Sequence, residues 1–217
     1  MSRDWSAVLF DLDGTLADTV ELILRSYRHT METHLGEAPP DRLFLDTMGK
    51  PLPTQIRDFA EDEAQAEAMR QTYVSFQREI HDDMVKPYPG ADSVLEELRG
   101  RGVKLGVVTS KASGIAARTL EACGLFGHID FLVCHDEVEK PKPDPESVVR
   151  ALEYFDLTDR PGDVIFVGDS PFDMQAGRGA GTKTGAALWG PFERDALEAQ
   201  QPDYWFDEIR SVLETAP

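Results

Sequence analysis

The stretch Ala7-Val8-Leu9-Phe10-Asp11-Leu12-Asp13-Gly14-Thr15 is the most informative part of the chain. Its first four residues form an apolar run that is too short for a helix and is typical of a buried parallel strand. Because residues two apart in a strand point the same way, Asp11 and Asp13 are expected to leave its carboxyl end together. Two carboxylates this close repel each other, and a divalent cation such as Mg²⁺ would relieve that repulsion. The alternative is a simple turn, since Asp and Gly are common turn formers.

Length and composition restrict the class of protein. The chain has 217 residues, of which 41% are hydrophobic, and can form one large domain or two small ones. Its apolar runs fall far short of the roughly 20 residues that a membrane helix needs. The start of the chain lacks the apolar stretch of a secretory signal, so a cytoplasmic location is expected. The net charge of −18 argues against a nucleic-acid partner, which would require a basic face.

The order of apolar runs and helical patterns predicts an α/β fold with a Rossmann-like parallel sheet. Residues 17–84 interrupt the alternation with two helical stripes and show no strand pattern. We therefore expect an α/β core from residues 1–16 and 85–217, and a small α-helical cap domain from residues 17–84. Further strands are predicted over 103–108, 131–134, 164–167 and 184–188, with helices near 91–99, 112–123, 145–155 and 171–176.

Reactive side chains follow the predicted strands. In open α/β sheets, ligands bind at the carboxyl ends of the strands, so residues from separate strands can share one site. Thr109 and Ser110 could alternatively cap the next helix, Lys140 could be a solvated loop lysine, and Lys111 is expected at the surface. The groups concerned are Asp11-Leu12-Asp13, Thr109-Ser110-Lys111, Lys140-Pro141-Lys142-Pro143, and Gly168-Asp169 with Asp173.

Taken together, these motifs resemble the haloacid dehalogenase superfamily of aspartate-nucleophile phosphatases. The resemblance spans nearly the whole chain, and the helical insert lies where that family carries its α-helical cap. Tyr88-Pro89-Gly90 and Gly168-Asp169-Ser170 look especially like the phosphoglycolate phosphatase branch. The four-part pattern is highly specific for the superfamily and only weakly specific for the branch.

The resemblance implies roles for the acidic residues. Asp11 would be the nucleophile that forms an aspartyl-phosphate, and Asp13 would act as general acid and then as general base. Mg²⁺ would be held by the Asp11 carboxylate, the Asp13 main-chain carbonyl and Asp169. Asp173 would orient the catalytic lysine or a water bound to the metal.

The resemblance also implies groups that bind the phosphoryl oxygens. These are the Thr109 hydroxyl, with Ser110 in the same turn, and the Lys140 ammonium. Lys142 competes with Lys140 for the family position. Lys140 is preferred because a Pro-x-Pro-Asp tail follows the catalytic lysine directly in the family. Lys50 lies where related caps carry a specificity loop, and is as well explained as a surface lysine.

The expected function is that of a Mg²⁺-dependent hydrolase of a small phosphorylated metabolite, with a 2-phosphoglycolate-like ester favoured. A sugar phosphomutase of the β-phosphoglucomutase type and a pyrophosphatase would share the core motifs. A non-enzymatic alternative is a signalling module that is phosphorylated on Asp. No membrane partner is expected, and the protein would be a monomer or a homodimer.

Overall fold

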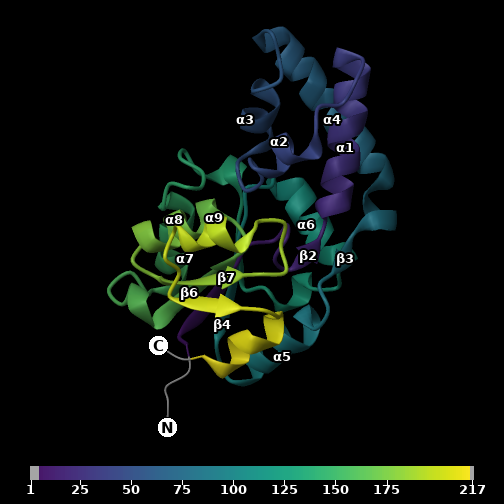
Figure 1. Ribbon diagram of the computed structural model, residues 1–217. Helices are drawn as coiled ribbons and strands as arrows, with labels where there is room; N and C mark the ends of the chain where they lie inside the picture. The colour runs from purple at the N-terminus through teal and green to yellow at the C-terminus, as the bar shows by residue number, and fades with distance from the viewer. Residues whose placement is uncertain (1–4, 216–217) are drawn as a thin grey trace.

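A six-stranded parallel sheet forms the base of the molecule (Figure 1). The computed structural model describes residues 5–215. The strand order is β5-β4-β1-β6-β7-β8, and the predicted α/β class is therefore confirmed. The last of these strands, β8, was not predicted. The strands are β1 (Ala7–Phe10), β4 (Lys104–Val108), β5 (Phe131–Val133), β6 (Val164–Gly168), β7 (Lys183–Ala187) and β8 (Tyr204–Phe206).

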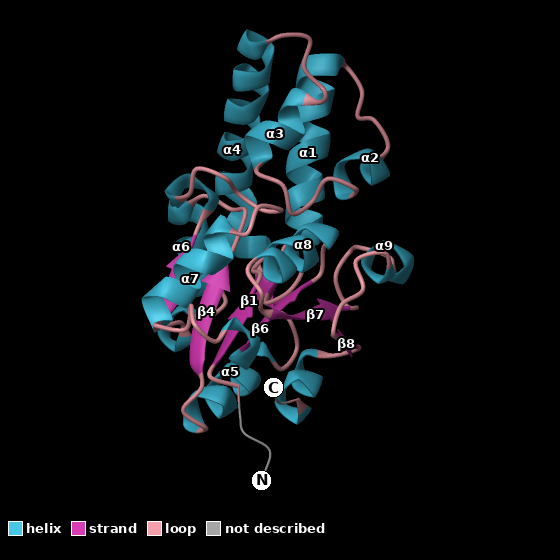
Figure 2. Cartoon of the chain, turned by 90° about the vertical axis from the view of Figure 1, so that its left-hand side faces the viewer, coloured by secondary structure: helices cyan, strands magenta, loops and turns pink. Residues whose placement is uncertain are grey.

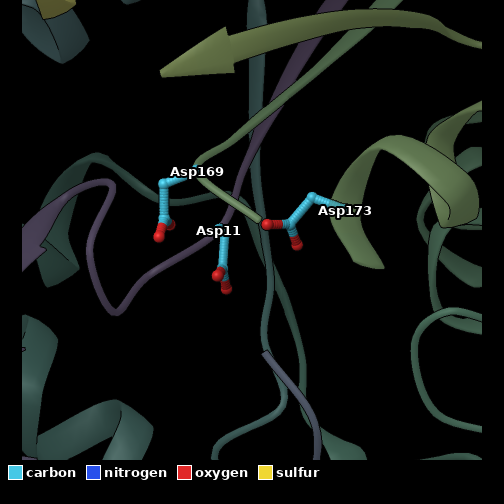
Figure 3. Close-up of side chains that lie close together, drawn as sticks. All are labelled: Asp11, Asp169 and Asp173. Carbon is cyan, nitrogen blue, oxygen red and sulfur yellow. The ribbon is translucent and has the colours of Figure 1, made fainter. Parts of the chain in front are cut away.

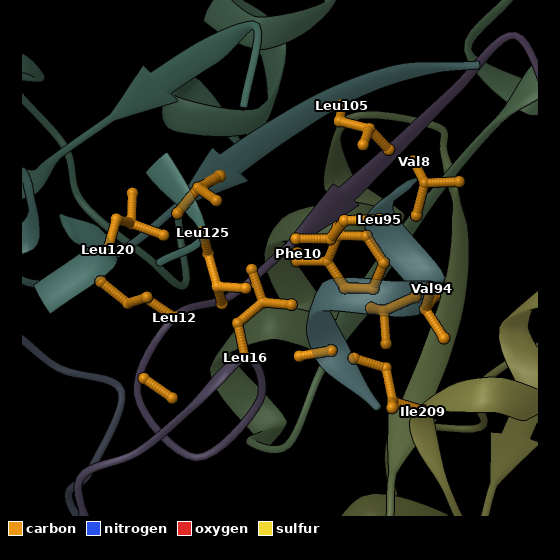
Figure 4. Close-up of a cluster of buried hydrophobic side chains, with 14 of the residues drawn as sticks. Val8, Phe10, Leu12, Leu16, Val94, Leu95, Leu105, Leu120, Leu125 and Ile209 are labelled. Carbon is orange, nitrogen blue, oxygen red and sulfur yellow. The ribbon is translucent and has the colours of Figure 1, made fainter. Parts of the chain in front are cut away.

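Helices cover both faces of the sheet because its strands bury side chains on both sides. Val8 and Phe10 of β1 pack on one face with α5 (Ala91–Gly100) and α6 (Ser113–Ala122), as Figure 4 shows. The alternate residues Ala7 and Leu9 pack on the other face. That second face is covered by α7 (Glu146–Phe155) and α8 (Pro171–Gly179). A shorter helix, α9 (Arg194–Glu198), precedes β8.

The strand register brings three loops to one edge of the sheet. Phe10, the last residue of β1, pairs with Val107 on one side and with Val167 on the other. The residues that follow these three strands therefore emerge side by side. This is the edge where ligands bind in open α/β sheets.

Four helices form a group of their own beyond this edge (Figures 1 and 2). They enclose a separate hydrophobic cluster that includes the fully buried Tyr27, Phe44 and Met69. The helical stripes predicted within residues 17–84 thus pack as a helix–helix core. The four helices are α1 (Val20–Leu35), α2 (Asp41–Leu45), α3 (Leu52–Arg57) and α4 (Glu63–Met84).

A short two-stranded ribbon connects the helical group to the sheet. β2 (Ala17–Asp18) pairs in antiparallel fashion with β3 (Lys86–Pro87), where the chain leaves and re-enters the α/β part. The prediction of no strand within residues 17–84 was wrong for β2. The two residues of this strand are too few to produce an alternating pattern. The domain boundaries at 17 and 84 stay a prediction. The remaining regular segments are 3-10 helices at Phe126–His128, His135–Glu137, Pro161–Asp163 and Ile209–Glu214.

Within residues 5–215, no helix combines the length and the apolar character that crossing a bilayer requires.

Candidate active site

Three buried aspartates meet at the carboxyl edge of the sheet (Figure 3). Asp11 follows β1, Asp169 follows β6, and Asp173 lies in the first turn of α8. One carboxylate oxygen from each lies within 4.8 Å of the others. The sequence motifs that carry these three residues are therefore brought together as predicted.

Asp169 is held close to the turn that follows β1. Its Oδ1 accepts a hydrogen bond of 2.7 Å from the Thr15 hydroxyl. Gly14 has a φ of +83°, and a Cβ built there would lie 2.6 Å from Asp169 Oδ2. Only glycine satisfies both the left-handed backbone and the close approach at this position. The Asp-Leu-Asp-Gly-Thr turn therefore also positions the carboxylate that comes from the other strand.

Lys142, rather than Lys140, is the lysine of the site. Its Nζ lies 3.0 Å from Asp11 Oδ1 and 2.6 Å from Asp173 Oδ1, and donates to the carbonyl of Val108 at the end of β4. The Lys142 side chain is 1% exposed. An ammonium this deeply buried is stable only when carboxylates and other acceptors surround it.

The prediction that Lys140 binds phosphate is contradicted by its position. Lys140 is exposed, and its main-chain N–H donates to Glu146 Oε2 at 2.8 Å. The neighbouring N–H of Glu139 donates to the other oxygen of the same carboxylate. Glu146, in the first turn of α7, thereby fixes this part of the loop on the outside of the molecule.

Lys111 is a second lysine of the site, although the sequence suggested a surface position. Its Nζ lies 2.6 Å and 2.8 Å from the two carboxylate oxygens of Asp13. The Lys111 side chain is 7% exposed. The Thr19 hydroxyl also donates to Asp13 Oδ1, at 2.6 Å. Asp13 is thus fixed at the edge of the cluster by two residues, Thr19 near the two-stranded ribbon and Lys111 in the turn after β4.

The turn after β4 contributes hydroxyl groups. Thr109 is buried, and its Oγ1 accepts a hydrogen bond from the Lys111 N–H at 3.1 Å, which leaves the hydroxyl proton available. Ser110 Oγ instead donates to the carbonyl of Gly49 in the helical group at 2.5 Å. Thr109 therefore lies at the sheet edge with a hydroxyl that can donate, and its role as a phosphate ligand stays a prediction. The Ser110 hydroxyl connects the two parts of the molecule, and its role in phosphate binding stays a prediction.

Asp173 has both carboxylate oxygens engaged. Oδ1 contacts Lys142, and Oδ2 accepts from the Ser170 N–H at 3.0 Å and from the Ser170 hydroxyl at 2.6 Å. Asp173 is fully buried. This arrangement suits a residue that positions the lysine more than one that binds a metal.

The charge balance of the cluster fits a divalent cation. Three buried carboxylates face one ammonium, that of Lys142. Asp11 Oδ1 is buried and makes no hydrogen bond, although Lys142 Nζ lies close to it. Burial, only partly offset by Lys142, raises the pKa of Asp11 to about 7. Burial and the charges of Asp11 and Asp173 raise the pKa of Asp169 as well. A hard cation with oxygen ligands would remove this excess of negative charge.

A cavity of about 590 Å³ opens between this cluster and the helical group. Asp11, Asp13 and Asp169 line it from the sheet side, together with Thr109 and Lys111. From the helical side, Lys50 lines the cavity with its Nζ 5.5 Å from the centroid of the Phe172 ring. Lys50 is therefore placed where a substrate would reach it, and its role in specificity stays a prediction.

The model of the haloacid dehalogenase-like hydrolase family matches residues 8–187 of this chain. The chain belongs to this family. The match includes all the residues that form the acidic cluster and its lysines. The predictions of this family and of a hydrolytic enzyme are confirmed.

Individual relatives match the sequence or the structure of this haloacid dehalogenase-like hydrolase over nearly their whole length. A protein from Bacillus cereus named pyrophosphatase PpaX is 36% identical over 208 residues, which cover 96% of this chain and 94% of the relative. A solved structure of a hydrolase of the haloacid dehalogenase-like family from Streptococcus pneumoniae is 27% identical, with a TM-score of 0.84 and 97% of each chain covered. A crystal structure of a predicted phosphoglycolate phosphatase from Haemophilus somnus has a TM-score of 0.89 over 97% of each chain. At 22% identity, this last similarity concerns the fold alone.

Proposed function

We propose that this haloacid dehalogenase-like hydrolase is a Mg²⁺-dependent phosphatase that works through an aspartyl-phosphate on Asp11. The observation that carries the proposal is the placement of the Asp11 carboxylate. It is buried beside the Lys142 ammonium, and it lines a cavity that can hold a substrate. A carboxylate in this setting is suited to attack a phosphoryl group whose charge the neighbouring cation stabilises.

The reaction has two steps that both break a bond to phosphorus. In the first, an oxygen of Asp11 attacks phosphorus, the bond to the leaving oxygen breaks, and Asp13 gives that oxygen a proton. In the second, Asp13 takes a proton from water, and the water oxygen attacks the phosphorus of the aspartyl-phosphate. Phosphate leaves, and Asp11 is regenerated as a carboxylate.

Groups at the sheet edge would bind and neutralise the phosphoryl group. Lys142 and the Thr109 hydroxyl would bind phosphoryl oxygens, and Asp173 holds Lys142 in position. The residues that would hold Mg²⁺ are Asp11 and Asp169, with the main-chain carbonyl of Asp13. When bound there, Mg²⁺ supplies positive charge that neutralises the phosphoryl oxygens.

The first candidate substrate is a 2-phosphoglycolate-like ester, and the second is pyrophosphate, because the Bacillus cereus relative carries that name. Both compounds bear a second anionic group next to the phosphoryl group that is transferred. A screen of phosphate release with Mg²⁺ over metabolite esters, sugar phosphates and pyrophosphate tests the proposal. Isomerisation of a sugar phosphate without phosphate release would indicate a mutase instead. Stable labelling by acetyl phosphate, without turnover of any ester, would indicate a signalling module.

Asp13→Asn is expected to lower kcat by roughly 10²–10⁴-fold, because an amide cannot transfer the proton to the leaving group. The loss should be smaller for esters with acidic leaving groups, such as p-nitrophenyl phosphate, which need little protonation. Comparison of kcat for p-nitrophenyl phosphate and for an alkyl phosphate measures this difference. An equal loss with both substrates would contradict the assignment of Asp13 as general acid.

Chelation of divalent cations is expected to stop phosphate release, and added Mg²⁺ should restore it. Asp169→Asn should raise the Mg²⁺ concentration needed for half-maximal activity by at least about tenfold, since it removes a charged ligand. Titration of activity with Mg²⁺ measures the change. Asp159→Asn, which alters an exposed aspartate away from the cavity, is the matched control. An unchanged Mg²⁺ requirement in Asp169→Asn would exclude this residue as a ligand.

A further inference from the structure

The cavity has a far side that the catalytic groups do not use. Its volume of about 590 Å³ lies in the range of roughly 300–1,000 Å³ that is typical of pockets for drug-sized ligands. The acidic cluster occupies only the end of the cavity at the sheet edge. The opposite wall comes from α1, α3, α4 and the loop before α3, and this wall would face whatever is attached to the phosphoryl group.

This opposite wall is positively charged in an acidic protein. The chain has 40 acidic and 22 basic residues, yet the residues between 17 and 84 that line the cavity include no carboxylate. They do include three cations, Lys50, Arg70 and Arg78. A wall with this charge attracts anions and disfavours neutral or cationic groups.

Arg78 is the arginine of this cavity that is free to bind a ligand. Arg70 is engaged by the carboxylate of Glu67, and Arg118, which lines the cavity from α6, is engaged by Asp82. Within residues 5–215, the guanidinium of Arg78 has no carboxylate partner, and its side chain is exposed. The main-chain carbonyl of Arg78 accepts a hydrogen bond from Arg118.

Apolar side chains line the same cavity as Arg78. Tyr73 and Val74 line the cavity from α4, Ile23 lines it from α1, and Ile115 lines it from α6. Contact with such residues stabilises only a ligand that has apolar surface of its own. Neither 2-phosphoglycolate nor pyrophosphate offers a surface of this kind.

We propose that the preferred substrate is a phosphomonoester whose leaving group has an apolar body, aryl or branched alkyl, and a second anionic group that binds Arg78. This inference rests on the proposed phosphatase function, and it places a different class of substrate ahead of 2-phosphoglycolate and pyrophosphate. Hydrolysis would break the P–O bond to the leaving group and release phosphate and a hydroxylated acid. The apolar body would contact Ile23, Val74 and Ile115.

The apolar part of the proposal is tested by the size of the leaving group. We would measure kcat/KM with Mg²⁺ for 4-carboxyphenyl phosphate, 2-phosphoglycolate and pyrophosphate. Each buried methylene-sized group is worth about fourfold in binding, so the aryl ester should exceed both small anions by at least about tenfold. If either small anion has the same or a higher kcat/KM, the apolar leaving group is excluded and the proposed phosphatase function still holds.

The anionic part is tested with a neutral analogue and a charge-removing variant. The comparison is between 4-carboxyphenyl phosphate and 4-carbamoylphenyl phosphate, which differ in charge and little in shape. The ratio of their kcat/KM values should fall by about fivefold in Arg78→Gln, mainly through the KM of the carboxyl ester, because only that ester carries the charge that the guanidinium binds. The intrinsic reactivities of the two leaving groups affect this ratio equally in the unaltered enzyme and in the variant. They therefore cancel when the ratio is compared between the two enzymes.

Arg57→Gln is the matched control, because Arg57 lies in the same helical group, is exposed and does not line the cavity. A ratio that changes in Arg78→Gln and not in Arg57→Gln supports the proposal. A ratio that is unchanged in Arg78→Gln, or that changes equally in both variants, overturns it. Absence of phosphate release from all the compounds by the unaltered enzyme would contradict the phosphatase function itself, and this inference with it.

Discussion

Asp11→Asn should lower the rate of phosphate release by roughly 10⁴-fold or more, since it removes the nucleophile on which both steps depend. The folded state should remain, because the amide has the same shape as the carboxylate and Lys142 keeps its contact with Asp173. Phosphate release measures the activity, and thermal unfolding monitored by circular dichroism measures the stability.

The stability measurement separates loss of chemistry from loss of structure. Burial beside other carboxylates raises the pKa of Asp11, so the neutral amide should not lower the thermal midpoint of the protein without metal. If Asp11→Asn were both inactive and unfolded, its loss of activity would not identify the nucleophile. The thermal midpoint of the Asp13→Asn protein serves as the folded reference for this comparison. A folded Asp11→Asn protein with substantial activity would remove Asp11 from the role of nucleophile.

The second large effect is expected from substitution of Lys142, for which the neighbouring Lys140 is the matched control. Lys142→Met leaves Asp11 and Asp173 buried without their cation, which should lower the free energy of unfolding by about 3–5 kcal/mol. Activity should fall by about 10²–10³-fold, as when a donor to the reacting group is lost. Lys140→Met should change the free energy of unfolding by less than about 0.5 kcal/mol and leave activity nearly unchanged. Urea unfolding and phosphate release measure both properties.

A double variant shows whether the stability loss comes from unpaired charge. Asp173→Asn combined with Lys142→Met removes one buried carboxylate along with the ammonium, and should recover part of the lost stability. Activity should stay low, because the lysine is still absent. If Lys140→Met proved the damaging substitution and Lys142→Met the harmless one, the assignment made from the structure would be wrong.

The choice between these two lysines illustrates what the sequence could not provide. In an extended segment, residues two apart point the same way, so the spacing of Lys140 and Lys142 carries no information about which one enters the site. What separates them is the carboxylate of Glu146, which binds the main-chain N–H groups of Glu139 and Lys140 from the start of α7. This is a contact between a loop and the following helix, and no periodic pattern reports it.

Lys111 was missed for a related reason. A lysine in a turn before a helix is most often solvated, and nothing in its neighbours indicates otherwise. Its partner Asp13 is 98 residues away in the chain. The sheet brings the two residues together because β1 and β4 are adjacent, and the long Lys111 side chain spans the remaining distance to the Asp13 carboxylate.

The parts that could be predicted depend on local patterns. The run from Ala7 to Phe10 is a strand because it is short and wholly apolar, and Asp11 follows it at the sheet edge. The acids at 169 and 173 lie near Asp11 because parallel strands end at the same edge. The ribbon strand β2 and the edge strand β8 have only two and three residues, which is too short for a periodicity to be visible.

The formation of a phosphoryl group on Asp11 is the claim on which the mechanism depends, and chemical trapping tests it most directly. The enzyme would be mixed with Mg²⁺ and p-nitrophenyl phosphate, quenched in acid, treated with borohydride and digested for mass spectrometry. Hydride reduces an aspartyl-phosphate to homoserine, so the predicted result is homoserine at position 11 and unmodified aspartate at position 13. Phosphate release in the same sample with aspartate intact at position 11, or with homoserine at another position, would contradict the account.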